Sequence, residues 1–239
     1  MLDIVRCPQM PRGARSIISD IPYHIIHRGN NRQKIFFCDT DYRYFLSLIE
    51  EAKKKYECRL YSYVLMPNHI HLLLKSLQSS ENLAKYIKLI AQKYSQRINK
   101  RYKRTGTLWE GKFKSSPVSE DDYLLACSRY IEMNPVRARI VKDPKDYMWS
   151  SYKYKIGQDE GATLFEPDPL YIDLGKDDKE RQGNYRKWFK ETIPSQEWDT
   201  IRKAVNEGGV FGNSDFKEKM EKLLGRRLDI RDRGRPKRK

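Results

Sequence analysis

Two histidines two residues apart are the side chains best placed to do chemistry. His69 and His71 stand in the run MPNHIHLLL, residues 66–74, which predicts a strand from residue 69. Residues two apart on a strand share a face, so both imidazoles would project side by side, with Ile70 in the core behind them. Two neutral imidazoles held in this way form half of a site for a divalent metal. The alternative is an exposed polar pair on the solvated face of the sheet.

A tyrosine and an asparagine further along the chain could complete such a site. The acidic residues after Ser119 predict a helix start, and within that helix Tyr130 and Asn134 lie four residues apart on one face. Asn134 precedes a proline, which places it near the helix end. A hydroxyl nucleophile beside a metal is what phosphodiester transesterification requires. The alternative is an ordinary buried stripe formed by Tyr123, Cys127, Tyr130 and Asn134.

Composition favours a polyanionic partner. The 239 residues carry a formal net charge of +16, and the isoelectric point is near 9.6. The four cysteines show no C-x-x-C spacing, which predicts free thiols in a reducing compartment and hence a cytoplasmic protein. With a mean hydropathy of −0.84 and no apolar run of membrane-spanning length, we expect no membrane association. The N-terminus also lacks the apolar core of a signal peptide.

The predicted elements alternate between strands and helices. We expect strands at 21–28, 59–66, 69–76 and 107–118, and helices at 41–55, 81–102 and after residue 119. This order predicts an α+β fold, a ferredoxin-like antiparallel sheet with helices on one face. We expect it to occupy residues 1–155, followed by a linker or wrap at 156–194. A small helical segment at 195–225 and a basic tail at 226–239 would complete the chain.

At this point the chain resembles a known family, the HUH single-tyrosine transposases of insertion sequences, and most closely the REP-associated tyrosine transposases. Four motifs carry the resemblance, in order within residues 12–155: YHIIHRGNNR (23–32), MPNHIH (66–71), WEGKF (109–113) and YIEMNPVRA (130–138). The resemblance implies the HUH endonuclease fold. It also implies that His69, His71 and Asn134 bind Mg²⁺ or Mn²⁺ and that Tyr130 is the nucleophile. Related enzymes often carry Gln where Asn134 stands, and Glu132 is a weaker candidate ligand because it projects from another side of the helix.

The implied activity is metal-dependent nicking and strand transfer of single-stranded or hairpin DNA through a 5′-phosphotyrosine. In some relatives the partner subunit donates the tyrosine helix, so a homodimer is one expected assembly. The alternatives are a catalytically silent DNA- or RNA-binding regulator on the same fold, a metal-independent RNA-binding module with a ferredoxin-like sheet, and a hydrolytic metallonuclease in which Tyr130 is only structural. We interpret His24 and His27 as structural, because they fall on opposite faces of their strand.

Four arginines are candidate DNA contacts. Arg28 and Arg32 flank Gly29-Asn30-Asn31 and could hold phosphates, although a solvated basic turn is as plausible. In the tail, Arg233 and Arg235 stand in the sequence RGRP, the core of an AT-hook, which lays guanidinium groups into a narrow A·T minor groove. The alternative for the tail is non-specific phosphate binding.

Overall fold

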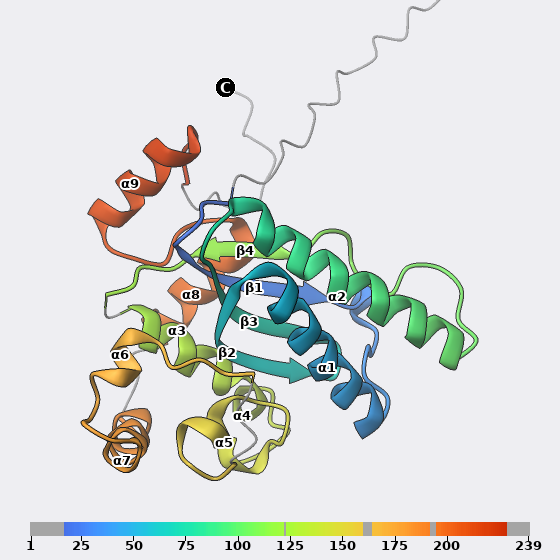
Figure 1. The fold of residues 1–239 in the computed structure, drawn as a ribbon, viewed down its shortest axis with the longest axis horizontal. Coiled ribbons are helices and arrows are strands. Elements are labelled where there is room, and N and C mark those ends of the chain that lie inside the picture. Colours follow the sequence, from blue (N-terminus) through green and yellow to red (C-terminus); the bar gives the residue numbers. More distant parts are fainter. Residues whose placement is uncertain (1–16, 122, 160–163, 192–194, 229–239) are drawn as a thin grey trace, which may run out of the picture.

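A four-stranded antiparallel sheet forms the centre of the molecule (Figure 1). The structure, a computed structural model, describes residues 17–121, 123–159, 164–191 and 195–228. The strands run in the order β2-β3-β1-β4, with bounds β1 Pro22–Arg28, β2 Cys58–Met66, β3 His69–Ser76 and β4 Lys114–Pro117. The first three match the prediction. The fourth is much shorter than the expected 107–118, because Gly106 and Gly111 adopt positive φ values of 82° and 61° and keep the preceding segment irregular.

Helices account for most of the remaining described chain, so the α+β class is confirmed. The two longest are α1 Asp39–Tyr56 and α2 Ser80–Arg101, both expected, and α3 Tyr123–Glu132 carries Tyr130. The other helical elements are η1 Asn30–Arg32, α4 Asn134–Arg137, η2 Pro144–Asp146, α5 Tyr152–Lys155, α6 Pro169–Ile172, α7 Asp178–Phe189, α8 Ser195–Glu207 and α9 Ser214–Leu224. Among the described helices, none is long and apolar enough to cross a membrane.

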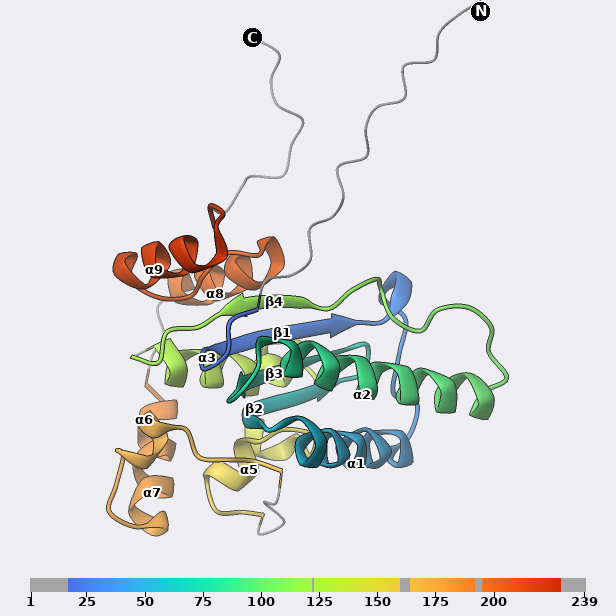
Figure 2. The ribbon, with the colours of Figure 1, turned by 45° about the horizontal axis from the view of Figure 1, so that its top comes forward.

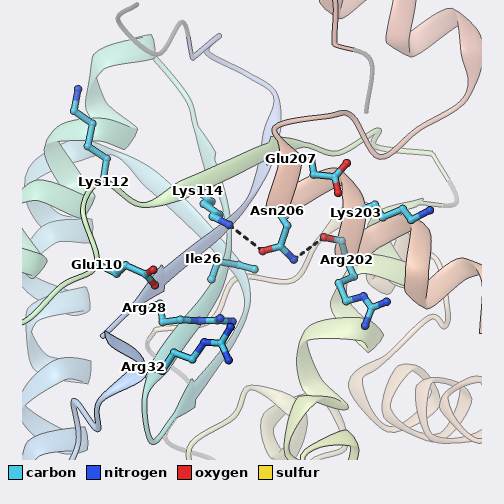
Figure 3. A pocket seen from close by; sticks show the side chains of 10 residues that line it. All are labelled: Ile26, Arg28, Arg32, Glu110, Lys112, Lys114, Arg202, Lys203, Asn206 and Glu207. Carbon is cyan, nitrogen blue, oxygen red and sulfur yellow. Dashed lines mark hydrogen bonds between the residues drawn. The ribbon is translucent and has the colours of Figure 1, made fainter. Parts of the chain in front are cut away.

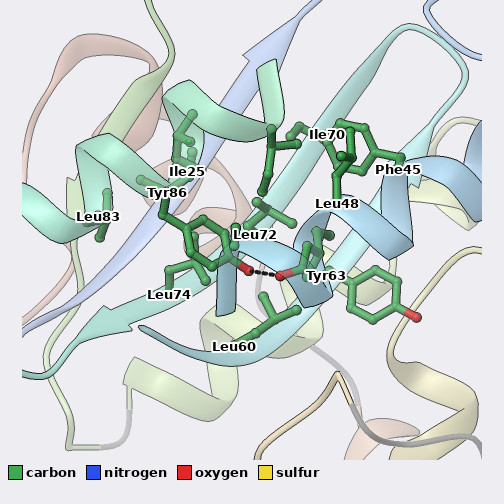
Figure 4. Close-up of a cluster of buried hydrophobic side chains, with 14 of the residues drawn as sticks. Ile25, Phe45, Leu48, Leu60, Tyr63, Ile70, Leu72, Leu74, Leu83 and Tyr86 are labelled. Atoms are coloured by element: carbon green, nitrogen blue, oxygen red, sulfur yellow. Dashed lines mark hydrogen bonds between the residues drawn. The ribbon is translucent and has the colours of Figure 1, made fainter. Parts of the chain in front are cut away.

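One face of the sheet packs on α1 and α2. Ile25 of β1 stands opposite Leu72 of β3, and both are fully buried in the larger of the apolar clusters (Figure 4). Within this cluster the hydroxyl of the buried Tyr86 donates a hydrogen bond of 3.3 Å to the carbonyl oxygen of Ile49, which ties α2 to α1. Ile70 also points to this face, as the alternation predicted.

The opposite face is covered as well, and here the expected placement of helices on one face needs correction. Leu73, which neighbours Leu72 on the strand and therefore points the other way, packs in a second cluster with Leu124 and Ile131 of α3 and Ile201 of α8. The physical reason is that β2 and β3 are buried at nearly every position. Strands that are apolar on both faces need helices on both faces.

The C-terminal elements lie toward the two sides of the sheet. In Figure 2, α8 and α9 lie beyond β4, whereas α6 and α7 lie on the side of β2. The stretch expected as a linker thus contains two helices, and Tyr185 and Phe189 of α7 are buried. The loop between α8 and α9 continues the sheet, because Phe211 N donates to the Pro117 carbonyl at 3.0 Å and Ser119 N to the Phe211 carbonyl at 2.9 Å. The expected domain boundaries themselves stay predictions.

Candidate active site

The histidine pair lies on the face of the sheet that α3 covers. The register places His71 opposite Ile26 and His69 opposite Arg28, and the two imidazole centroids are 5.0 Å apart. Both side chains therefore point to one side, as their spacing predicted. His71 is buried, with 3% of its surface exposed, whereas His69 is half-buried near the end of the strand.

A third histidine, which sequence reasoning treated as structural, contacts this pair. His24 of β1 projects on the same face, and its Nε2 lies 2.8 Å from Nδ1 of His71. His27 points to the opposite face and stacks on Trp109, with ring centroids 4.2 Å apart. The two strands that meet here, β1 and β3, are separated in the chain by α1 and β2, so the contact becomes visible only once their pairing is known. An alternation pattern within one strand carries no such information.

All three imidazoles of this face are held in the neutral form. Burial lowers the pKa of His24 to about 3 and that of His69 to about 4, where the Arg28 charge also contributes. Burial, followed by the neighbouring imidazoles and by Arg28 and Arg137, lowers the pKa of His71 well below its usual value. Neutral imidazoles retain a lone pair, which is the form that binds a metal ion.

The hydrogen bonds suit ligation through the Nε2 atoms. Nδ1 of His69 lies 2.6 Å from Oδ1 of Asn68, so this nitrogen carries the proton and Nε2 keeps its lone pair. If Nδ1 of His71 likewise donates to His24, Nε2 of His71 is free to ligate. The proton of His24 then sits on its own Nδ1, a buried atom with no hydrogen-bond partner among the described residues.

Tyr130 packs directly against the histidines. Its ring centroid lies 5.7 Å from that of His24 and 6.1 Å from that of His71. It is covered from the other side, because Trp198 of α8 lies 5.5 Å away between centroids. The Arg137 guanidinium stands over both rings, at 4.7 Å from Tyr130 and 5.0 Å from Trp198. As a result only 3% of the Tyr130 surface is exposed. The nucleophile predicted from sequence therefore lies beside the histidines, with Trp198 and Arg137 packed over its ring.

Asn134 has a structural use of its own. It begins α4, and its amide nitrogen donates to the carbonyl oxygens of Tyr130 at 2.9 Å and Ile131 at 3.1 Å. These carbonyls belong to the last turn of α3, where backbone acceptors lack helical partners. The side-chain oxygen of Asn134 is then the atom that could reach a metal ion.

The donor atoms of these residues are suited to form part of a binding site for a divalent ion. His69 and His71 offer two neutral nitrogens, and Asn134 an amide oxygen one helix turn beyond Tyr130. Among the described residues, however, no three His, Cys, Asp or Glu side chains are grouped in a way that could hold a metal. A bound ion would therefore need oxygen ligands beyond the histidines, from Asn134, from water or from the substrate.

Glu132, the weaker candidate ligand, is engaged elsewhere. Its carboxylate is fully buried on the other side of α3, where it accepts hydrogen bonds from Ser151 at 2.6 Å and Tyr185 at 2.7 Å. Nζ of Lys155, also fully buried, lies 3.3 Å from the same carboxylate. This network ties the tyrosine helix to α5 and α7 and leaves Glu132 facing away from the histidines.

The predicted DNA-binding arginines divide into two groups. Arg28 and Arg32 line one cleft between β1 and α8 (Figure 3). Arg233 and Arg235 lie outside the residues that the structure describes. Arg129, near the nucleophile in sequence, is buried and donates to the Trp188 carbonyl at 3.1 Å, so it has a structural role. Trp109 is also a packing residue, since its Nε1 donates to the Ala91 carbonyl at 3.0 Å.

Part of the chain is similar to known proteins. Residues 17–134 match the family model "Transposase IS200 like". A Haemophilus influenzae (strain ATCC 51907 / DSM 11121 / KW20 / Rd) protein described as "Putative REP-associated tyrosine transposase" is 26% identical over 124 residues, which cover 47% of this chain and 70% of the relative.

The fold is also that of a solved transposase. A structure described as a REP-associated tyrosine transposase bound to a REP hairpin superposes with a TM-score of 0.53 at 17% identity, covering 66% of this chain and 90% of the other. The matched family segment contains all four residues that the resemblance marked, His69, His71, Tyr130 and Asn134. Residues 17–134 therefore resemble the IS200-like transposase family in sequence, and the fold is that of a REP-associated tyrosine transposase.

Proposed function

We propose that this protein nicks single-stranded DNA and transfers the strand through a covalent 5′-phosphotyrosine on Tyr130. The observation that carries the proposal is the packing of Tyr130 against His24 and His71, on the face that also bears His69, within a transposase domain. A hydroxyl beside a pair of neutral imidazoles is the arrangement that metal-assisted attack on a phosphodiester requires.

The chemistry assigned to Tyr130 is an exchange of phosphoester bonds. Its phenolic oxygen forms a bond to phosphorus while the bond from phosphorus to the 3′ oxygen breaks. The phenol releases a proton and the leaving 3′ oxygen gains one, so the step has no net proton demand. Because the phosphotyrosine keeps the ester, a free 3′ hydroxyl can attack it and join two strands without ATP.

His69, His71 and Asn134 are the residues that we assign to Mg²⁺ or Mn²⁺. When bound, the ion would polarise the phosphate and offset the charge that develops on it. His24 orients His71 through the 2.8 Å contact. Asn68 performs the same task for His69 at 2.6 Å. All of these residues belong to one chain, and the homodimer stays a prediction.

Burial of Tyr130 has a mechanistic consequence. With 3% of its surface exposed, the Tyr130 ring is enclosed, and we expect Trp198 and Arg137 to shift when a phosphate comes into reach of the tyrosine. This burial is also the observation that favours the second candidate function, a catalytically silent DNA-binding regulator. A nicking assay separates the two.

The test is to incubate the protein with a single-stranded hairpin DNA and Mg²⁺ or Mn²⁺ and to look for a denaturation-resistant protein–DNA adduct. Tyr130→Phe should abolish the adduct and retain DNA binding. Tyr123→Phe is the matched control on the same helix, because Tyr123 packs on Phe211 with ring centroids 4.9 Å apart. Cleavage without an adduct would indicate a hydrolytic metallonuclease. Binding without cleavage would indicate the regulator.

A further inference from the structure

A basic cleft lies between the sheet and the C-terminal helix α8. Its floor is the edge of the sheet at β1 and β4, and its far wall is α8 (Figure 3). The cavity measures about 550 Å³. Lys114 of β4 donates to Oδ1 of Asn206 at 3.1 Å, and Nδ2 of Asn206 donates to the Arg202 carbonyl at 2.8 Å. These contacts hold α8 against β4 and give the cleft a defined width.

Cations dominate the lining of the basic cleft. Six of the ten lining side chains are Lys or Arg, namely Arg28, Arg32, Lys112, Lys114, Arg202 and Lys203, against two carboxylates, Glu110 and Glu207. Within the described chain, Arg28, Arg32, Lys112 and Lys203 form no ion pair with a carboxylate, and Arg202 pairs only with the exposed Asp199 of its own helix. A cleft with this excess of positive charge is a site for an anion.

The basic cleft opens beside the candidate active site. Ile26, on its floor, stands opposite His71 in the register of β1 and β3, and Arg28 stands opposite His69. Directly opposed residues of an antiparallel pair have Cβ atoms about 5 Å apart. A phosphate held by Arg28 would therefore adjoin the phosphate that Tyr130 is proposed to attack. Arg202 and Lys203 would hold the same strand from the other wall.

We propose that the basic cleft binds the sugar–phosphate backbone of single-stranded DNA adjoining the cleaved phosphate, and that α8 thereby contributes DNA contacts from outside the family domain. The assignment of the cleaved phosphate rests on the proposed function, whereas binding in the cleft does not. The matched domain ends at residue 134, so Arg202 and Lys203 are contacts that this segment alone does not supply.

The size of the basic cleft favours a single strand over a duplex. Its volume lies within the range of about 300–1,000 Å³ that is typical of cavities for small molecules. A space of this size matches about one or two nucleotides and is too small to enclose a double helix.

The test compares two variants, each of which removes two exposed cations from a C-terminal helix. Arg202→Ala/Lys203→Ala alters the basic cleft, and Lys187→Ala/Lys190→Ala alters α7 and the residue that follows it, on the β2 side of the molecule. Both pairs are made in a Tyr130→Phe background, so that only binding is measured. The probe is a short labelled oligodeoxythymidylate, titrated from about 50 to 200 mM salt.

The α8 variant should bind more weakly, and the slope of log affinity against log salt should be shallower by about 1.4. Each phosphate of a single strand that the protein no longer neutralises lowers the magnitude of this slope by about 0.7. The α7 control should keep the parental slope. An unchanged slope in the α8 variant, or equal changes in both variants, would overturn the proposal. Equal weakening towards a duplex of the same length would overturn the assignment to single strands.

Adduct formation distinguishes this inference from the proposed function. Adduct formation by the protein with Tyr130 intact and no other change tests the chemistry, and the salt slope of the α8 variant tests the basic cleft. If the slope shifts as expected but no form of the protein makes an adduct, DNA binding in the basic cleft is supported and the proposed covalent chemistry on Tyr130 is wrong. If the adduct forms but the slope does not shift, the proposed covalent chemistry is supported and the assignment of the basic cleft to DNA binding is wrong.

Discussion

Nε2 of His24 lies 2.8 Å from Nδ1 of His71, which makes a buried pair out of two residues from different strands. A metal-ligating histidine commonly has its second ring nitrogen fixed by such a partner, which sets the tautomer and orientation of the ring. Here the partner is another imidazole, itself neutral because burial lowers its pKa to about 3. The contact extends the two-histidine motif to a third residue that is 1% exposed.

Replacing His24 by phenylalanine should weaken Mn²⁺ binding by about 10- to 100-fold, the usual effect of removing a group that orients a metal ligand. Phenylalanine keeps the ring but cannot accept the proton of His71. His24→Gln retains an acceptor and should restore part of the affinity. Electron paramagnetic resonance of bound Mn²⁺ gives the measurement. His27→Phe is the matched control on the same strand, and equal weakening in both variants would argue against an orienting role.

Trp198 should restrain the nucleophile. Its ring and that of Tyr130 lie 5.5 Å apart between centroids, with Arg137 over both. Trp198→Ala would open this cover and should raise the rate of adduct formation by up to about tenfold, which corresponds to about 1.4 kcal/mol of activation free energy. Single-turnover kinetics with excess protein measure this rate. Trp188→Ala, which removes a tryptophan packed on Arg129, serves as control. A slower rate in Trp198→Ala alone would make Trp198 part of the working site.

Local patterns predicted the elements better than the site. The alternation around Ile70 and the helical spacing around Tyr130 gave the correct faces, because both depend only on backbone periodicity. The contact of His24 with His71 depends on pairing between distant strands, and the Trp198 cover depends on the docking of α8. No short window of sequence encodes either. The short β4 was also missed, since positive φ at Gly106 and Gly111 is a turn feature within a strand-like composition.

The buried pair of Glu132 and Lys155 should be critical for folding. Both side chains are fully buried, 3.3 Å apart, and Lys155 also contacts Ser62 of β2 at 2.6 Å. Lys155→Met would leave the carboxylate buried without its cation and should lower the free energy of unfolding by about 3–5 kcal/mol. Urea unfolding measures the change. Lys153→Met, on the same helix but half-buried, should change stability by less than about 1 kcal/mol. Similar small effects for both lysines would contradict the prediction.

The basic tail should contribute affinity rather than chemistry. Removal of residues 229–239 retains Leu228, which is buried, and leaves the proposed nucleophile Tyr130 and the proposed metal ligands in place. The shortened protein should show a shallower salt dependence of DNA binding and unchanged adduct formation at saturating DNA. Arg233→Gln/Arg235→Gln separates the two interpretations of the tail. A specific loss of preference for A·T-rich duplex would indicate the AT-hook, whereas a uniform loss across sequences would indicate phosphate binding. Abolished cleavage after truncation would place the tail in the active assembly.

Protonation of the buried histidines should destabilise the protein in mild acid. In the unfolded chain a histidine binds a proton below about pH 6.5, but burial lowers the native pKa of His24 to about 3 and that of His69 to about 4. The unfolded state therefore binds more protons as pH falls through this window, and the free energy of unfolding must fall. Each such histidine contributes a slope approaching about 1.4 kcal/mol per pH unit.

The range from about pH 6.5 to 5 isolates this effect, because ordinary carboxylates titrate mostly below it. Urea unfolding at a series of pH values measures the slope, and His24→Phe should have a shallower slope than the wild type. That variant has lost a group that is neutral in the folded protein and charged in the unfolded one. A wild-type stability that stays level over this range would mean that the histidines accept protons in the native state. In that case burial would not hold the imidazoles neutral, and they would lose their metal-binding form as the pH falls through about 6.5.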